Sequence, residues 1–156
     1  MEQLHRVQRY LDRMREIYSG CPHRYDRVEF YEDDVVSFFI HCHHIYDWLL
    51  VNKSAVLTKP ELNQFINNHI ELQVCADFCN GKKHCILTRT WSGLQPQIGK
   101  RNWMIMTFRK ETGKPVTFRS TYEVIHGGVT YDALELAEKC LSLWQAQVRR
   151  IALITI

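Results

Sequence analysis

Hydrophobic positions at the start of the chain recur at alternating spacings of three and four residues. They are Leu4, Val7, Leu11, Met14 and Tyr18. Because an α-helix turns once in about 3.6 residues, this spacing places these side chains on one face. Ser19, Gly20 and Pro22 follow and favour the end of a helix. The pattern predicts an amphipathic helix over about residues 2–18.

A wider apolar face follows between Asp33 and Val51. Its apolar positions are Val35, Phe38, Phe39, Cys42, Ile45, Tyr46, Leu49 and Leu50. At about 100° per residue they cover an arc of roughly 140°, which is typical of a helix inside a bundle. We therefore predict a second helix over these residues.

The next helical segment begins with a capping signal. Thr58 is followed three residues later by Glu61, which predicts reciprocal capping of the first helical turn. Pro60 also suits this turn, because the N–H that proline lacks would have no partner there. A third helix is therefore predicted to begin at about residue 58.

A second signal of the same kind predicts a break in this helix. Asn68 and Glu71 repeat the spacing, so we expect the helix to stop near Asn67 and a further piece to run over about residues 69–80. Gly81 is expected to end that piece, since glycine readily takes the left-handed conformation that follows many helices.

The pattern changes period after this glycine. Residues 85–91 and 102–109 are rich in β-branched and aromatic side chains, which favour strands. The loop between them contains Gly93, Pro96 and Gly99. Along residues 116–124 apolar and polar positions alternate, as in a strand with one face in water. Since Gly113 lies just before this segment, residues 102–124 are predicted to form an antiparallel hairpin.

A last helix is predicted to begin near Asp132, which has Glu135 at capping distance. Its apolar seam consists of Leu134, Ala137, Leu141, Trp144, Val148 and Ile151. The tail from Ile151 to Ile156 is almost entirely apolar. Such a chain end is expected to be buried, either in its own core or against a second copy of the chain in a homodimer.

Together these elements predict a single domain with an α+β fold. We expect a helical bundle of about four helices with a small antiparallel β-sheet inserted before the last helix. The length of 156 residues suits one core. No apolar run approaches the roughly 20 residues of a membrane helix, and the charged first residues do not form a secretion signal. No membrane association is therefore expected.

Cysteine usage and net charge indicate the compartment and the kind of partner. The six cysteines lie mostly in apolar segments, where reduced thiols act as small hydrophobes, so a cytoplasmic location is expected. A net charge of +3 is small, so nucleic-acid contact requires a local patch. Basic and aromatic candidates for such a patch are Arg6, Arg9, Arg13, Lys100, Arg101, Trp103, Arg109, Lys110 and Arg119.

The stretch Cys79–His84 is the first candidate site. A helix end with lysines beside it accounts for Asn80, Gly81, Lys82 and Lys83 without any function, because lysine complements the negative end of the helix dipole. It accounts less well for His84. Two neighbouring lysines favour the neutral imidazole, which can act as an acid or base near pH 7.

The order of an apolar helix, an asparagine, three residues and a histidine resembles the motif of the HEPN superfamily. Members of this superfamily are helical bundles that often carry Arg-Asn-x-x-x-His and cleave RNA. Asn80 and His84 match the motif, whereas Cys79 stands where the family has arginine. The resemblance covers about half the chain, and the predicted strands are not part of the common HEPN core. The segments His41–Trp48 and Asn80–His84 are also similar to uncharacterised bacterial proteins.

This resemblance implies a protein that acts on or senses RNA, such as a metal-independent ribonuclease of a bacterial defence or toxin system, with no cofactor. His84 would act as general base or acid on a ribose hydroxyl. Lys82 or Lys83 would replace the arginine in holding phosphate charge. The alternative is a non-catalytic helical interaction or dimerisation module, which Cys79 favours because the family's arginine and histidine act together.

A second candidate cluster consists of His41, His43, His44 and Asp47. On a helix, His41 and His44 lie about 60° apart, whereas His43 and Asp47 form a separate pair one turn apart. The pair suits a carboxylate that orients an imidazole, and equally a plain hydrogen bond within a helix.

Zinc binding is the third possibility. Cys75, Cys79, His84 and Cys85 place four suitable donors within a short segment. Their spacing differs from the usual Cys-x-x-Cys pattern, and Cys85 would have to leave its predicted strand, so no metal site is expected.

Overall fold

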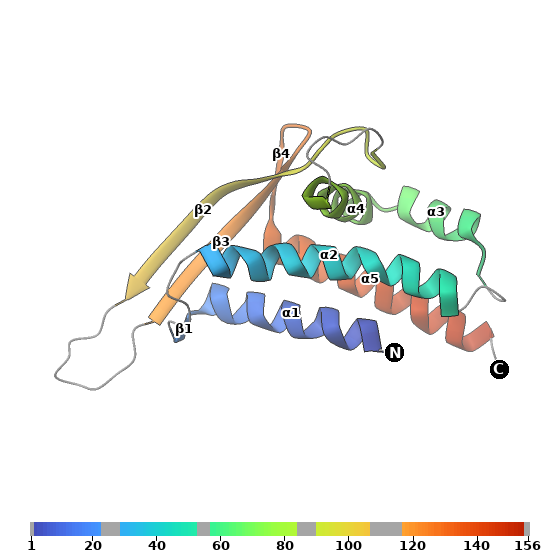
Figure 1. Cartoon of the computed structure of the whole chain (residues 1–156), viewed down its shortest axis with the longest axis horizontal. Coiled ribbons are helices and arrows are strands. Elements are labelled where there is room, and N and C mark those ends of the chain that lie inside the picture. Colours follow the sequence, from blue (N-terminus) through green and yellow to red (C-terminus); the bar gives the residue numbers. More distant parts are fainter. Residues whose placement is uncertain (1, 23–28, 53–56, 84–89, 107–116, 155–156) are drawn as a thin grey trace.

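The structure is a computed structural model that describes residues 2–22, 29–52, 57–83, 90–106 and 117–154. Three long helices run side by side, and each contacts the other two (Figure 1): α1 (Glu2–Ser19), α2 (Glu29–Asn52) and α5 (Ala133–Ile154). Two shorter helices follow α2, namely α3 (Lys59–Asn67) and α4 (Ile70–Lys83). Figure 1 shows α4 almost end-on, because it crosses the direction of the long helices.

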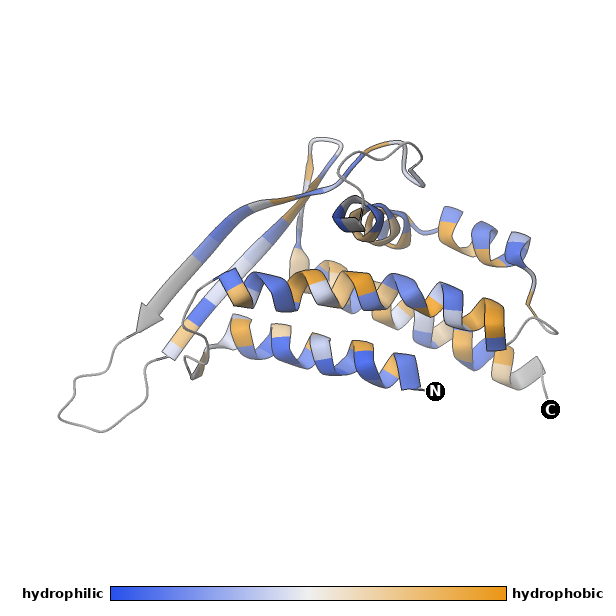
Figure 2. Cartoon of the chain, in the orientation of Figure 1, coloured by the Kyte–Doolittle hydropathy of each residue, from blue (hydrophilic) through white to orange (hydrophobic). Residues whose placement is uncertain are grey.

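The apolar faces predicted from the sequence form the core between these helices. Val7, Leu11 and Met14 of α1 are fully buried, as are Phe38 and Phe39 of α2. In Figure 2, apolar residues recur along the helices, whereas the coloured part of the β2 ribbon is mainly hydrophilic. Within the described residues, no helix is both long enough and apolar enough to cross a membrane.

The first capping signal is confirmed. The Thr58 hydroxyl accepts a hydrogen bond from the Glu61 amide at 3.4 Å, and the Glu61 carboxylate accepts one from the Thr58 amide at 2.7 Å. The break after Asn67 is also confirmed, but Asn68 caps the end of α3. Its amide donates to the Gln64 carbonyl, and its side-chain oxygen accepts from the Gln64 side chain.

The predicted end of α4 at Gly81 is wrong, since α4 continues to Lys83. The physical reason is the backbone conformation of Gly81, whose φ angle is not positive. Gly81 therefore does not form the left-handed turn that ends many helices. Because glycine has no side chain, the Gln95 side chain can approach the helix at this position. Its Nε2 would lie 3.4 Å from a Cβ at Gly81.

The predicted hairpin pairing is confirmed by β2 (Gln97–Met106) and β3 (Thr117–His126), which are antiparallel. The strand β2 begins five residues earlier than predicted, because Gly99 is part of it. A Cβ at Gly99 would lie 2.7 Å from Ile125 Cγ1, so only glycine allows this close approach of the strands. The register shifts between Ile98 and Arg101, as in a β-bulge.

Two short strands were not predicted: β1 (Cys21–Pro22) and β4 (Val129–Asp132). Gly127 and Gly128 have positive φ and form the turn between β3 and β4, as Gly-Gly pairs commonly do in hairpins. The predicted strand over residues 85–91 lies mostly outside the described residues, and Trp91 forms a bend. The turn predicted around Gly113 also lies outside them.

The sheet precedes the last helix, so the predicted α+β fold is confirmed. Its strand order is β1-β3-β2, and β4 also pairs with β3. The predicted cap of α5 is confirmed as well, because Asp132 Oδ1 accepts hydrogen bonds from the amides of Leu134 and Glu135 at 2.9 and 3.0 Å.

Between β1 and β4, the edge of β3 is covered by a tyrosine of α1. The Tyr18 hydroxyl donates to the Tyr122 carbonyl and accepts from the Tyr122 amide, each at 3.0 Å. One phenol thus satisfies the two backbone groups that a neighbouring strand would otherwise pair. Burial raises the pKa of Tyr18, so the hydroxyl keeps its proton.

We predict that Tyr18→Phe destabilises the fold by about 1–3 kcal/mol, because it leaves two backbone groups of Tyr122 without partners. Urea unfolding of the variant measures this change. Tyr10→Phe is the matched control on α1, since the Tyr10 hydroxyl makes no hydrogen bond to a described residue. Equal stability of the two variants would contradict the role of Tyr18.

Candidate functional site

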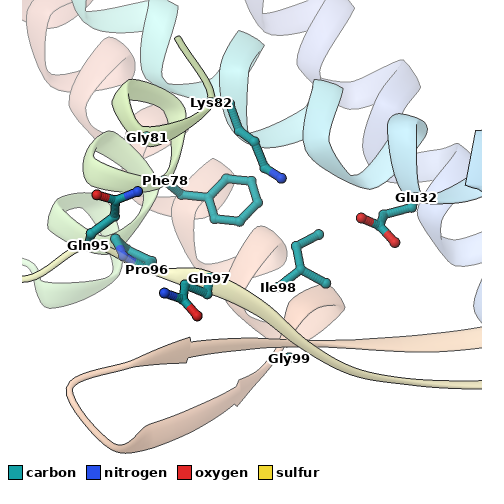
Figure 3. Close-up of a pocket in the computed structure, with 9 residues that line it drawn as sticks. All are labelled: Glu32, Phe78, Gly81, Lys82, Gln95, Pro96, Gln97, Ile98 and Gly99. Atoms are coloured by element: carbon teal, nitrogen blue, oxygen red, sulfur yellow. The ribbon is translucent and has the colours of Figure 1, made fainter. Parts of the chain in front are cut away.

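A cavity of about 430 Å³ lies where α4, α2 and the start of β2 meet (Figure 3). It is lined by Glu32, Phe78, Gly81, Lys82, Gln95, Pro96, Gln97, Ile98 and Gly99. Two of these residues belong to the candidate stretch Cys79–His84. The helix end that contains this candidate stretch therefore forms part of the wall of a cavity.

Lys82 is the cation of this cavity. Its ammonium lies 5.5 Å from the centre of the Phe78 ring, in a cation–π contact one turn along α4. Among the described residues, no carboxylate lies within ion-pair distance of Lys82. Its charge is therefore available to an anionic ligand.

The other residues of the stretch are placed differently. Asn80 is half-buried in α4 and does not line the cavity. Lys83 is the last residue of α4, whereas its side chain and the whole of His84 lie outside the described part of the chain. The structure thus brings Lys82 to the cavity and leaves the position of His84 a prediction.

Cys79, the first residue of this stretch, packs inside the core. Its side chain is fully buried, and its thiol donates to the Ile40 carbonyl of α2 at 3.9 Å. An arginine here would have to place its guanidinium between α2 and α4. The small cysteine side chain therefore allows these two helices to pack against each other. A neighbouring face of α4 lines the cavity.

The acidic wall of the cavity comes from the first turns of α2. Glu32 forms an ion pair of 3.7 Å with Arg101 of β2, and both side chains are partly exposed. In Figure 3, the Lys82 ammonium and the Glu32 carboxylate point toward one another across the space above Ile98. The cavity thus has charged groups on two sides and an apolar floor.

A buried carboxylate that the sequence analysis missed holds the loop before β2. Asp77 is fully buried in α4 and accepts hydrogen bonds from the amides of Trp91 and Ser92 at 2.6 and 2.8 Å. Its second oxygen also accepts from the Ser92 hydroxyl at 2.5 Å. The signal in the sequence was an acidic residue between buried apolar neighbours, because such a charge requires internal partners.

The network extends to the end of β3. His126 Nε2 lies 2.7 Å from the Ser92 hydroxyl oxygen, and His126 is buried. Serine therefore stands between the carboxylate and the imidazole. In a nucleophilic triad the histidine occupies the middle position. The order Asp77, Ser92, His126 instead suits a structural role, in which these hydrogen bonds connect α4, the loop before β2 and β3. We call this network of Asp77, Trp91, Ser92 and His126 the Asp77 clasp.

The histidines of the second cluster lie in two groups on α2. His41 stacks on Tyr10 of α1 at 5.1 Å and contacts His44 edge-on at 6.1 Å. Burial, together with the nearby charge of Arg6, lowers the pKa of His41. Its Nδ1 is buried and makes no hydrogen bond to any described residue. These features are typical of a histidine that packs in its neutral form.

His43 faces another side of α2. Its ring stacks on Tyr46 at 6.0 Å, and Tyr46 in turn contacts Trp91 at 6.2 Å. Asp47 lines a second cavity of about 310 Å³, together with Trp48, Val51 and Asn52. Among the described residues, Gly81 and Lys82 of the first candidate cluster line one cavity and Asp47 of the second lines the other.

The cysteines considered for zinc point to separate backbone groups. The Cys75 thiol donates to the Phe39 carbonyl at 3.5 Å, whereas that of Cys79 donates to Ile40. Cys85 and His84 lie outside the described residues. Within the described ranges, no group of three or more histidine, cysteine or acidic side chains is arranged to hold a metal ion.

The predicted basic patch is partly used by the fold. Arg119 donates to the Tyr18 carbonyl at 2.9 Å, and Arg13 pairs with Asp34 at 3.0 Å. Lys100 is exposed beside the cavity wall. The side chain of Trp103, together with Arg109 and Lys110, lies outside the part of the chain that the structure describes.

No protein-family model, no curated protein and no solved structure matches this chain.

We predict that Asp77→Ala destabilises the protein by about 2–4 kcal/mol, because it leaves two amides and a hydroxyl without their acceptor. Ser92→Ala removes only one hydroxyl and is expected to cost about 1 kcal/mol. Urea unfolding measures both values. If the two variants were equally stable, the buried carboxylate would not be the centre of the clasp.

Proposed function

We propose that this protein binds single-stranded RNA at the cavity beside the end of α4 and cleaves it without a metal ion, as an HEPN-like ribonuclease. One observation supports this most directly: Lys82, from the motif-bearing helix end, lines a cavity of about 430 Å³ and has no ionic partner among the described residues. If these residues served only to end the helix, no cavity would be needed beside them. A bacterial defence or toxin role in the cytoplasm would suit such an activity.

The proposed chemistry uses the ribose of the substrate as nucleophile. His84 takes the proton of a 2′-hydroxyl, and the 2′-oxygen then attacks the adjacent phosphorus. The bond to the 5′-oxygen breaks, and that oxygen takes a proton from water. The hydroxide that remains is neutralised by the proton on His84, which restores the neutral imidazole. The products are a 2′,3′-cyclic phosphate and a 5′-hydroxyl end. Lys82 stabilises the additional negative charge on the phosphate oxygens during the attack.

The expected result is that the purified protein cleaves labelled single-stranded RNA in the presence of a chelator. His84→Ala should reduce the rate by about 10²–10⁴-fold, because a general acid or base contributes this much. Lys82→Ala should also slow cleavage, whereas Lys139→Ala on the exposed face of α5 should not. Gel analysis of the products and of their ends measures the rates and identifies the cyclic phosphate.

Intact RNA at high protein concentration would overturn this proposal. Cleavage that persists in His84→Ala would also overturn it, because the activity would then come from another group or from a contaminant.

A non-catalytic dimerisation module is the second candidate function, and the far end of α2 favours it. Trp48 is 40% exposed and Val51 is 78% exposed, and both line the cavity of about 310 Å³. Large apolar side chains that gather at one exposed place commonly mark interaction surfaces. A second copy of this chain would cover them in a homodimer.

Light scattering tests this second candidate. We expect a dimer for the unmodified chain and a monomer for Val51→Asp, because burying an unpaired carboxylate in an apolar contact is costly. Val129→Asp is the matched control, since Val129 is also exposed but lies on β4. A strictly monomeric unmodified protein, or a dimer that tolerates Val51→Asp, would contradict dimerisation through this surface.

A further inference from the structure

Among the described residues that line the cavity of α4, α2 and β2, Lys82 carries a positive charge and Glu32 a negative one, and the two face each other. Arg101 pairs with Glu32 but does not line the cavity. A ligand group bound at Lys82 therefore faces a carboxylate across the cavity. A phosphodiester carries one negative charge, whereas a terminal phosphate carries about 1.5–2 near pH 7.

The ammonium of Lys82, an exposed side chain, already lies over the Phe78 ring before any ligand arrives. Its contact with the Phe78 ring keeps the ammonium over the cavity floor, and Phe78 itself is buried. Ordering a lysine side chain normally costs conformational entropy. Because part of this cost is already met in the unliganded protein, Lys82 is suited to bind an anion at a defined place.

Glu32 is also held in position. Its pairing with Arg101 keeps the carboxylate on the α2 side of the cavity, facing Lys82 in Figure 3. Because Glu32 lines the cavity and Arg101 does not, a second negative charge at the Lys82 position would be repelled by this carboxylate from across the cavity. At separations of several ångströms such repulsion changes affinity by about five- to tenfold.

The remaining surfaces suit one nucleotide. Ile98 points into the space between Lys82 and Glu32, and it offers an apolar surface to a base. Gln97 also lines the cavity, and its amide group can donate and accept hydrogen bonds. A volume of about 430 Å³ is within the range of small-ligand sites and is too small for a paired duplex.

We propose that this cavity binds one internal nucleotide of single-stranded RNA and selects a phosphodiester over a terminal phosphate. Lys82 binds the phosphodiester, Ile98 contacts the base, and Glu32 provides the selection by excluding a second negative charge. This inference rests on the proposed function and adds which part of the RNA the described residues bind.

The test compares a dinucleoside monophosphate with a nucleoside 5′-monophosphate. Binding is measured by nuclear magnetic resonance with the full-length His84→Ala variant, so that no cleavage disturbs the titration. The dinucleoside monophosphate is expected to bind at least about fivefold more tightly. The backbone amides of Gly81 and Gly99 should shift, because both residues line the cavity. Lys82→Ala should weaken binding of both ligands.

Glu32→Gln isolates the proposed selection. It keeps the size of the side chain and removes the charge, so the affinity for the nucleoside 5′-monophosphate should rise about five- to tenfold and the preference should disappear. Glu29→Gln, one turn earlier on the exposed surface of α2, is the matched control and should retain the preference. Circular dichroism verifies that each variant is folded.

The inference is overturned if the mononucleotide binds as tightly as the dinucleotide, if Glu32→Gln keeps the preference, or if the shifted amides lie elsewhere. These outcomes differ from failure of the proposed function. RNA cleavage without the preference would remove only this inference, whereas the preference without cleavage would remove only the ribonuclease activity.

Discussion

The buried carboxylate of Asp77 determines where the chain runs after it leaves α4. Its oxygens accept hydrogen bonds from two consecutive amides and a hydroxyl, so the segment at Trp91 and Ser92 is held against the helix. From there the chain passes Gln95 beside Gly81 and enters β2. The cavity wall, the start of β2 and the contact with His126 all depend on this placement. A charge buried without these partners would cost several kcal/mol, so the clasp and the loop stabilise each other.

The end of α4 separates packing from surface chemistry on neighbouring faces of one helix. Cys75 and Cys79 lie one turn apart and face α2, where their thiols donate to backbone carbonyls. Phe78 and Lys82 lie one turn apart on the face that lines the cavity. A substitution at the position of Cys79 therefore acts on the core, whereas one at Lys82 acts on the site. The chain therefore presents a cation beside the cavity although Cys79, three residues earlier, packs in the core.

Local signals in the sequence predicted the elements well, and long-range contacts explain the errors. The capping pairs of Thr58 and Asp132 involve residues a few positions apart, so spacing alone identified them. Gly81 and Gly99 were assigned to a helix end and a loop, because glycine suits those places. Both instead lie inside elements, where their missing side chains admit Gln95 and Ile125 from elsewhere in the chain. Asp77 was missed for the same reason: its partners are 14 and 15 residues away.

The single phenol that covers the middle of β3 also bears on self-association. A strand edge can template pairing with another molecule when several consecutive backbone groups are open. On this edge β1, the Tyr18 hydroxyl and β4 each occupy a short segment, so no long run is left between them. Unlike a strand, a hydroxyl cannot extend the ladder further. Loss of Tyr18 would therefore open both backbone groups of Tyr122 and lengthen the uncovered run between β1 and β4, in addition to weakening the fold.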